Sequence, residues 1–204
     1  MAITVYQGDL PDGLDLGPVV AIDTETMGLR TLRDRLCVVQ LSSGDGNAHL
    51  VQFQAGSDYR APNLKRVLED TKVLKLFHFA RFDLAALKQY LGAATTPVYC
   101  TRTASKLVRT FTDRHGLKDL CRDLIGVEIS KQEQSSDWGA PNLTEAQQRY
   151  AASDVLYLHQ LRDVLDGMLA REGRAALAEA CFRFLPARAD LDLAGWPEED
   201  IFAH

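Results

Sequence analysis

The chain has 204 residues and a formal net charge of −5, with 46% hydrophobic and 25% charged residues. This composition is that of one large globular domain or two small ones, and it excludes a disordered or fibrous protein. No apolar run reaches the roughly 18 residues that a membrane helix needs, and the first residues lack the basic region of a secretory signal. We therefore expect a soluble, cytoplasmic protein that does not bind membranes.

The negative net charge disfavours a protein that coats nucleic acid without specificity. The charge is uneven, however, because residues 102–122 hold six bases and two acids, a local balance of +4. Three of the bases, Arg102, Lys106 and Arg109, recur at helical spacing, which on its own indicates a solvated helix face. The four cysteines lack the close spacing of a zinc or redox motif, which predicts reduced packing residues: Cys37, Cys100, Cys121 and Cys181.

The first half of the chain predicts five strands and two helices. Residues 19–22 form a short apolar run, and residues 36–41 and 48–53 are two further runs joined by a Ser/Gly/Asp-rich turn, which predicts antiparallel neighbours. Residues 73–79 and 98–100 follow as strands, with helices expected over 63–69 and 82–91. Paired strands followed by strands alternating with helices predict an α/β fold with a mixed five-stranded sheet flanked by helices.

No strand is apparent beyond Cys100, so the second half is predicted to be helical. A short helix over 117–124 ends at Gly126, and a longer helix begins at Thr144 with a capping box and runs to about residue 171. A last amphipathic helix over 174–185 is expected to stop at Pro186, before an acidic tail over 188–200. No repeat or linker divides the chain, which predicts one domain over residues 1–204.

Acidic residues stand where apolar residues are expected. Asp23 and Glu25 lie two apart at the end of the strand over 19–22, so both side chains leave the same face of the sheet. Asp83 follows the strand over 73–79 and shares a helical stripe with Leu87. A solvated strand end and a helix-start acid are the structural alternatives for these two positions.

Asp154 heads an apolar helix face. With Leu158, Leu161 and Leu165 it falls at i, i+4, i+7 and i+11, and Tyr150 lies one turn earlier on the same face. A core polar residue with satisfied hydrogen bonds is an equally good explanation for Asp154 alone.

The four acids belong to elements that are expected to meet at one end of one sheet. Four carboxylates gathered there would take up protons, unless two divalent cations kept all of them ionised. Oxygen ligands without a nearby cysteine favour Mg²⁺ or Mn²⁺. Two divalent cations would bring the formal net charge from −5 to −1, which no longer disfavours a phosphate ligand.

These motifs resemble the 3′-5′ exonucleases that are named for four acids, in the subgroup with a tyrosine in the third motif. Residues 22–26 (Ile-Asp-Thr-Glu-Thr) match the first motif, residues 77–84 the second and residues 150–154 (Tyr-Ala-Ala-Ser-Asp) the third. The segment 131–138, followed by Gln147 and Tyr150, is similar to ribonuclease D in particular. The resemblance covers nearly the whole chain and implies a ribonuclease H-like fold.

The chain is shorter than ribonuclease D, whose catalytic domain is followed by helical RNA-binding domains. Its length, its opening Asp-Thr-Glu-Thr-Met-Gly-Leu and its final helix resemble the stand-alone nanoRNase C subfamily instead. That resemblance implies cleavage of very short RNAs, including dinucleotides, and a ring-shaped homo-octamer. The expected products are nucleoside 5′-monophosphates released from the 3′ end.

The resemblance also assigns roles to the candidate site residues. Asp23, Glu25 and Asp154 are expected to hold the cation that binds the attacking water, with Asp23 bridging to a second cation held by Asp83. Tyr150 is expected to orient the water.

Candidate substrate contacts are more loosely defined. Leu29 has the offset from the first acid at which related oligoribonucleases place a wedge between the last two bases, although an ordinary turn hydrophobe explains it equally well. His78 and Arg81 flank the second acid and are candidates for phosphate contacts, with a core histidine as the alternative for His78. Trp138 is expected to stack on substrate or to pack in the core, and the basic face from Arg102 is a candidate track for the RNA backbone.

Two other functions are compatible with the sequence. A nucleic-acid-binding protein without activity could keep this fold, but we would expect it to have lost an acid or the tyrosine, and all five are present. A general exonuclease acting on longer RNA or on DNA would use the same four acids, and only a 2′-hydroxyl contact would distinguish it.

Overall fold

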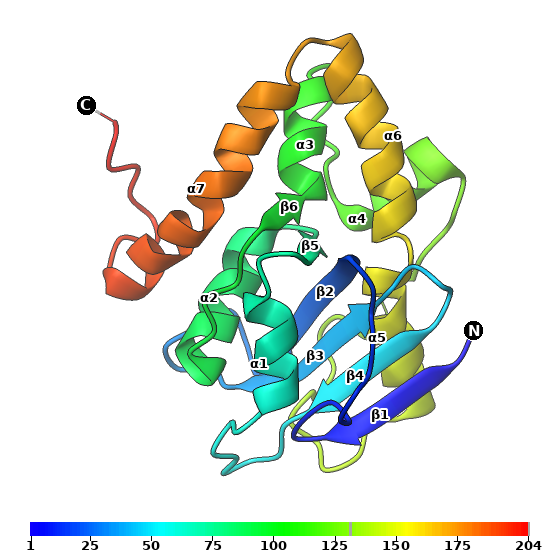
Figure 1. The fold of residues 1–204 in the computed structure, drawn as a ribbon, viewed down its shortest axis with the longest axis vertical. Coiled ribbons are helices and arrows are strands. Elements are labelled where there is room, and N and C mark those ends of the chain that lie inside the picture. Colours follow the sequence, from blue (N-terminus) through cyan, green and yellow to red (C-terminus); the bar gives the residue numbers. More distant parts are fainter. Residues whose placement is uncertain (131, 204) are drawn as a thin grey trace.

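The computed structural model describes residues 1–130 and 132–203 and contains one mixed sheet of six strands (Figure 1). The strands are β1 (Ile3–Gln7), β2 (Val19–Thr26), β3 (Leu36–Ser42), β4 (Ala48–Gln52), β5 (Leu74–Phe77) and β6 (Val98–Cys100). Their order across the sheet is β1-β4-β3-β2-β5-β6. The β2–β3 and β3–β4 pairs are antiparallel, whereas β1–β4, β2–β5 and β5–β6 are parallel.

The predicted α/β architecture is confirmed, but the predicted number of five strands was wrong. The missed strand is β1, which pairs with β4 at the edge of the sheet from Ile3 to Gln7. Its five residues are half-buried or exposed and show no clean alternation. A short edge strand buries little of its surface, so its sequence carries only a weak hydrophobic signal.

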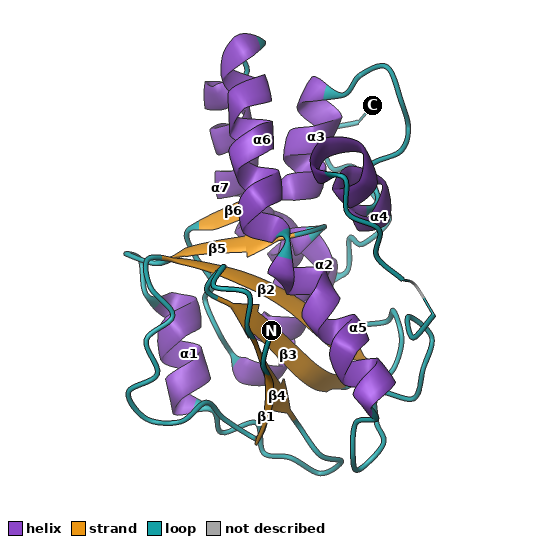
Figure 2. Ribbon diagram, turned by 90° about the vertical axis from the view of Figure 1, so that its right-hand side faces the viewer, coloured by secondary structure: helices purple, strands orange, loops and turns teal. Residues whose placement is uncertain are grey.

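Helices cover both faces of the sheet. They are α1 (Pro62–Glu69), α2 (Ala80–Leu91), α3 (Thr101–Val108), α4 (Leu117–Leu120) with the π-helical turn η1 (Cys121–Ile125), α5 (Glu145–Leu156), α6 (Leu158–Arg171) and α7 (Ala175–Ala194). Figure 2 shows α1 and α5 on opposite faces. Helix α5 packs on β1, β2, β3 and β4, while α3, α6 and α7 pack against one another beyond the β5–β6 edge (Figure 1). None of the helices in the described ranges combines the length and the apolar run that crossing a bilayer needs.

The long helix predicted from Thr144 is two helices. The capping box at Thr144 is present, but the helix breaks at Tyr157, whose φ of −107° and ψ of −3° depart from helical values. Helix α5 ends there and α6 starts in a new direction, so Asp154 does not share one helix with Leu158 and Leu161. The leucines of α6 are nevertheless buried in the main core.

The predicted end of the last helix at Pro186 was also wrong. Helix α7 continues through Pro186 to Ala194. The missing backbone N–H of a proline costs one hydrogen bond of the helix. Tertiary contacts hold the segment beyond it, because Lys88 of α2 pairs with Asp190 and Ala189 is buried.

Arg109 does not belong to the solvent-exposed basic helix face that the sequence predicts. Helix α3 ends at Val108, and the Arg109 side chain is buried, where its Nη2 atom pairs with Asp123 Oδ2 at 2.6 Å. All four cysteines are free thiols in buried or half-buried positions, as predicted.

Candidate active site

Three carboxylates from two elements meet at the end of strand β2. Asp23 and Glu25 lie on the same face of this central strand, and the β2–β3 register shifts directly after Glu25. Asp154 comes from α5, which packs on the same sheet. The three residues are half-buried, and each offers a carboxylate oxygen that lies within 4.8 Å of the others.

Asp83 lies beside this group rather than within it. Its side chain on the first turn of α2 is only 3% exposed. The hydroxyl of Thr24 donates a hydrogen bond of 2.7 Å to Asp83 Oδ1, so this residue fixes the position of the fourth acid. The sequence analysis missed Thr24; the signal was a threonine between two acids on a strand whose alternation turns it toward the core.

The carboxyl groups of this site are poorly suited to carry charge without a counterion. Burial raises the pKa of Asp23 to about 7. Burial, together with the carboxylates of Asp23, Asp154 and Asp83, raises the pKa of Glu25 to about 10. The pKa of Asp83 is also raised, chiefly by burial and then by Asp23. A cluster of oxygen donors with raised pKa values fits hard divalent cations, which would favour the ionised form of each ligand.

Tyr150 lies one helical turn before Asp154 on α5 and lines the same cavity. Burial and then the negative charges of Asp154, Glu25 and Asp23 raise the pKa of its hydroxyl group. The hydroxyl therefore keeps its proton at neutral pH and can act as a hydrogen-bond donor. Trp138 is 3% exposed and packs on the Tyr150 ring, with 5.9 Å between the ring centroids.

A cavity of about 620 Å³ opens from the three carboxylates. Leu29, His78 and Trp138 line it with Tyr150, so three of the four predicted substrate contacts border the cavity that holds the acids. Leu29 is 87% exposed, as an inserting side chain needs to be, whereas Trp138 belongs to a small core cluster. His78 Nδ1 lies 2.9 Å from Thr101 Oγ1. Within the segment similar to ribonuclease D, Lys131 lies outside the described residues and Gln134 lines the cavity.

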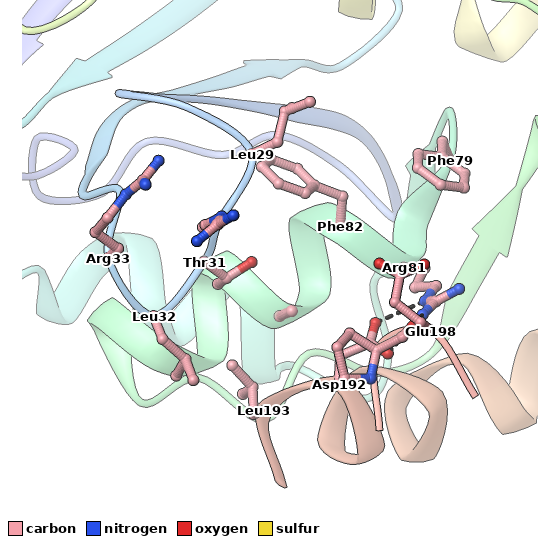
Figure 3. A pocket seen from close by; sticks show the side chains of 13 residues that line it. Leu29, Thr31, Leu32, Arg33, Phe79, Arg81, Phe82, Asp192, Leu193 and Glu198 are labelled. Carbon is pink, nitrogen blue, oxygen red and sulfur yellow. Dashed lines mark hydrogen bonds and ion pairs between the residues drawn. The ribbon is translucent and has the colours of Figure 1, made fainter. Parts of the chain in front are cut away.

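Arg81 lies outside the acid cavity and borders a neighbouring one of about 700 Å³. Its Nε and Nη2 atoms donate to the two carboxylate oxygens of Asp192 at 2.6 and 2.7 Å (Figure 3). The guanidinium group therefore ties α2 to the end of α7 instead of facing the acids. The two cavities share Leu29, Phe79 and Phe82, which lie in the upper half of the view in Figure 3.

Comparisons with known proteins agree with this arrangement. A family model described as 3′-5′ exonuclease matches residues 11–170. Ribonuclease D of Gluconacetobacter diazotrophicus is 39% identical over 157 residues, which cover 77% of this chain and 39% of that protein. The chain thus spans about two fifths of the length of this curated relative.

Solved structures extend the likeness. NrnC of Brucella melitensis, solved with bound Mg²⁺ and also bound to pGG, is 56% identical with a TM-score of 0.96. In the Mg²⁺ structure the match covers 100% of both chains. Escherichia coli RNase D is 27% identical over 84% of this chain and 45% of that one, with a TM-score of 0.72, which confirms the predicted fold class. The chain therefore belongs to the 3′-5′ exonuclease family of ribonuclease D.

Proposed function

We propose that this chain is a metal-dependent 3′-5′ exoribonuclease that hydrolyses short RNAs, including dinucleotides, to nucleoside 5′-monophosphates. The observation that carries the proposal is the group of three carboxylates within 4.8 Å of one another, with Tyr150 on the same cavity wall. The likeness to NrnC, which was solved with pGG and with Mg²⁺, supports short RNA as substrate and Mg²⁺ as a cofactor.

Asp23, Glu25 and Asp154 would hold one divalent cation, Mg²⁺ or Mn²⁺, and Asp83 with Asp23 would hold a second. Such ions lower the pKa of water and stabilise the charge that develops on a phosphodiester during hydrolysis. Thr24 keeps the Asp83 carboxylate in place through its hydrogen bond.

The remaining side chains position the substrate and the attacking water. Tyr150 keeps its proton and donates a hydrogen bond that orients the water, and Trp138 fixes the tilt of the tyrosine ring. Leu29 separates the last two bases at the mouth of the cavity, where its side chain is exposed. His78 contacts a phosphate from the edge of the second motif. Arg81 would reach a phosphate only after releasing Asp192.

We also propose that the protein self-associates as an octamer, as the resemblance to nanoRNase C implies. Large apolar side chains on the surface are available for such contacts, and Phe111 and Phe202 are the most exposed aromatic residues described. A native mass measurement of the purified protein tests this, with a monomer as the contrary result.

The activity is tested with 5′-labelled RNAs from two to about twenty nucleotides, incubated with Mg²⁺, Mn²⁺ or a chelator. We expect shortening from the 3′ end that needs a cation and is fastest on dinucleotides. Asp154→Asn should abolish it, whereas Asp163→Asn, at an exposed acid of α6, should not. Turnover by Asp154→Asn would refute the site.

Equal rates on long and short RNA would identify a general exonuclease instead. An arm with DNA of the same sequences tests the RNA preference.

A further inference from the structure

Phe79 has a backbone conformation that is costly for a bulky residue. It caps α2 with a φ of 70° and a ψ of 44°, in the left-handed region. Tyr59 is the one other non-glycine residue with positive φ in the described parts of the chain. Such conformations persist where surrounding structure enforces them, and they gather at functional sites. Phe79 is 44% exposed and lines both the acid cavity and its neighbour.

The face of the Phe79 ring carries a cation. The guanidinium carbon of Arg102 lies 4.5 Å from the ring centroid, close enough for a cation–π interaction. Arg102 stands on the first turn of α3 and lines the acid cavity together with Phe79. The ring therefore holds a positive charge at the wall of the cavity that the three carboxylates also line.

Arg102 has no anionic partner among the described residues. No described carboxylate lies within 4.0 Å of it, and its buried Nε atom lacks a hydrogen-bond acceptor there. Arg81, Arg109 and Arg188 behave differently, since each of them is paired with an aspartate. A buried donor of a charged group without an acceptor is unfavourable, so an arginine kept in this state is suited to an anion from outside the chain.

We propose that Arg102 binds a phosphate of the substrate strand, and that Phe79 is the positioning residue that holds its guanidinium group toward the cavity. This inference rests on the proposed function and adds a specific residue for recognition of the RNA backbone. A phosphate fits the site because its oxygens accept hydrogen bonds from the planar fork of an arginine. The aromatic ring covers one face of the group, so a phosphate would bind at its edge, where the N–H groups lie.

Three variants separate a phosphate contact from a merely structural contact with Phe79. Arg102→Met keeps an unbranched chain over the ring but removes the charge, and Arg102→Lys restores the charge without the fork. Lys72→Met is the control, because it removes one charge at an exposed position outside the cavity and outside the basic face of α3. Steady-state kinetics on a dinucleotide and on a heptanucleotide with Mg²⁺, and thermal melts, are measured for each.

We expect Arg102→Met to raise KM about ten-fold or more while kcat changes less, and Arg102→Lys to recover part of the loss. On the heptanucleotide, the slope of log(kcat/KM) against log salt should become shallower by about 0.7, the value for one phosphate contact to a single strand. Lys72→Met should remain within about two-fold of the wild type. Unchanged KM and salt slope in Arg102→Met would overturn the inference, as would a loss explained by a lower melting temperature and not recovered by lysine.

Dinucleotides with and without a 5′-phosphate identify which phosphate is bound. If Arg102→Met raises KM equally for both dinucleotides, Arg102 binds the internal phosphodiester. If KM rises only for the 5′-phosphorylated dinucleotide, Arg102 binds the terminal phosphate. The activity of the wild type distinguishes failure of the proposed exoribonuclease function from failure of the role proposed for Arg102. If the wild type does not degrade RNA, the proposed function fails. If the wild type is active but the Arg102 substitutions change neither KM nor the salt slope, only this inference fails.

Discussion

Binding of Mg²⁺ to the metal-free protein should release protons. The pKa of Glu25 is raised from 4.5 to about 10 and that of Asp23 from 3.8 to about 7. At pH 7 Glu25 thus keeps one proton and Asp23 about half of one, so a cation that needs both carboxylates ionised expels about 1.5 protons. The raised pKa of Asp83 makes this number a lower bound if a second cation binds.

This number fixes the pH dependence of metal affinity. Between pH 6 and pH 7 the Glu25 proton contributes a factor of about ten and the Asp23 proton a factor of about five, so the apparent Mg²⁺ affinity should rise about fifty-fold. Calorimetric titration of chelator-stripped protein in two buffers of different ionisation enthalpy gives the proton count directly. Glu25→Gln should lower the count by about one. An enthalpy that does not depend on the buffer would refute the reasoning.

The same pKa shifts set the sign of the stability change. A carboxyl group whose pKa is higher in the folded than in the unfolded state binds more protons when folded, so the free energy of unfolding falls as the pH rises. For the metal-free protein the fall should start near pH 4 and continue through pH 7, the range set by Asp23, with Glu25 extending it upward. Mg²⁺ should flatten this dependence in thermal melts, and a melting temperature that rises over this range without metal would contradict the assignment.

Three further substitutions have expected outcomes. Thr24→Val removes the donor to buried Asp83 and should lower the free energy of unfolding by about 1–3 kcal/mol in urea titrations. Thr24→Ser keeps the hydroxyl group and should not lower it. Equal stabilities of Thr24→Val and the wild type would show that the hydrogen bond is unimportant. Tyr150→Phe should slow hydrolysis about ten- to hundred-fold with unchanged Mg²⁺ affinity by calorimetry, and a wild-type rate would leave the tyrosine with a packing role only. Arg109→Met removes a buried guanidinium from its carboxylate partner and should cost about 1–3 kcal/mol by the same urea assay, while the exposed Arg114→Met should cost almost nothing. Indistinguishable midpoints for these two arginine variants would refute the buried pair.

The sequence was informative where burial is complete. Strand β3 is buried along its whole length, and the apolar part of β2 is nearly so, which makes both visible as apolar runs. Strand β1 was not predicted because it is a half-exposed edge strand, and its parallel partner β4 lies more than forty residues away in the chain. Local pattern cannot show such a pairing, since it depends on contacts made only in the folded chain.

Helix boundaries were predicted less well than helix positions. The break at Tyr157 has no glycine or proline to mark it, and Pro186 marks an end that does not occur. In the second case, ion pairs from α2 to Asp190 and Asp192 hold the helix beyond the proline. Tertiary contacts routinely override local helix preferences in this way.

Asp23, Glu25 and Asp83 could be located in advance because a carboxylate beside an apolar run is unusual in itself, and the resemblance to the third exonuclease motif supplied Asp154 and Tyr150. Thr24 and Phe79 were not predicted, and Arg102 was predicted only as part of a basic helix face. Their significance depends on a hydrogen bond, a backbone angle and a ring contact that only the folded chain displays. Arg81 was predicted to contact phosphate from its place beside the second acid. In the folded chain its guanidinium group is instead paired with Asp192.

The bend at Tyr157 divides the site between two layers of the molecule. Helix α5 packs on the sheet and carries Asp154, whereas α6 packs on α3, which carries Arg102. The acids of the candidate active site and the wall proposed to bind the nucleic-acid backbone are thus anchored in different parts of the core. The shape of the α3–α6 layer can therefore change to fit another nucleic-acid strand while the carboxylates keep their positions. We expect relatives with different substrates to diverge first in that layer.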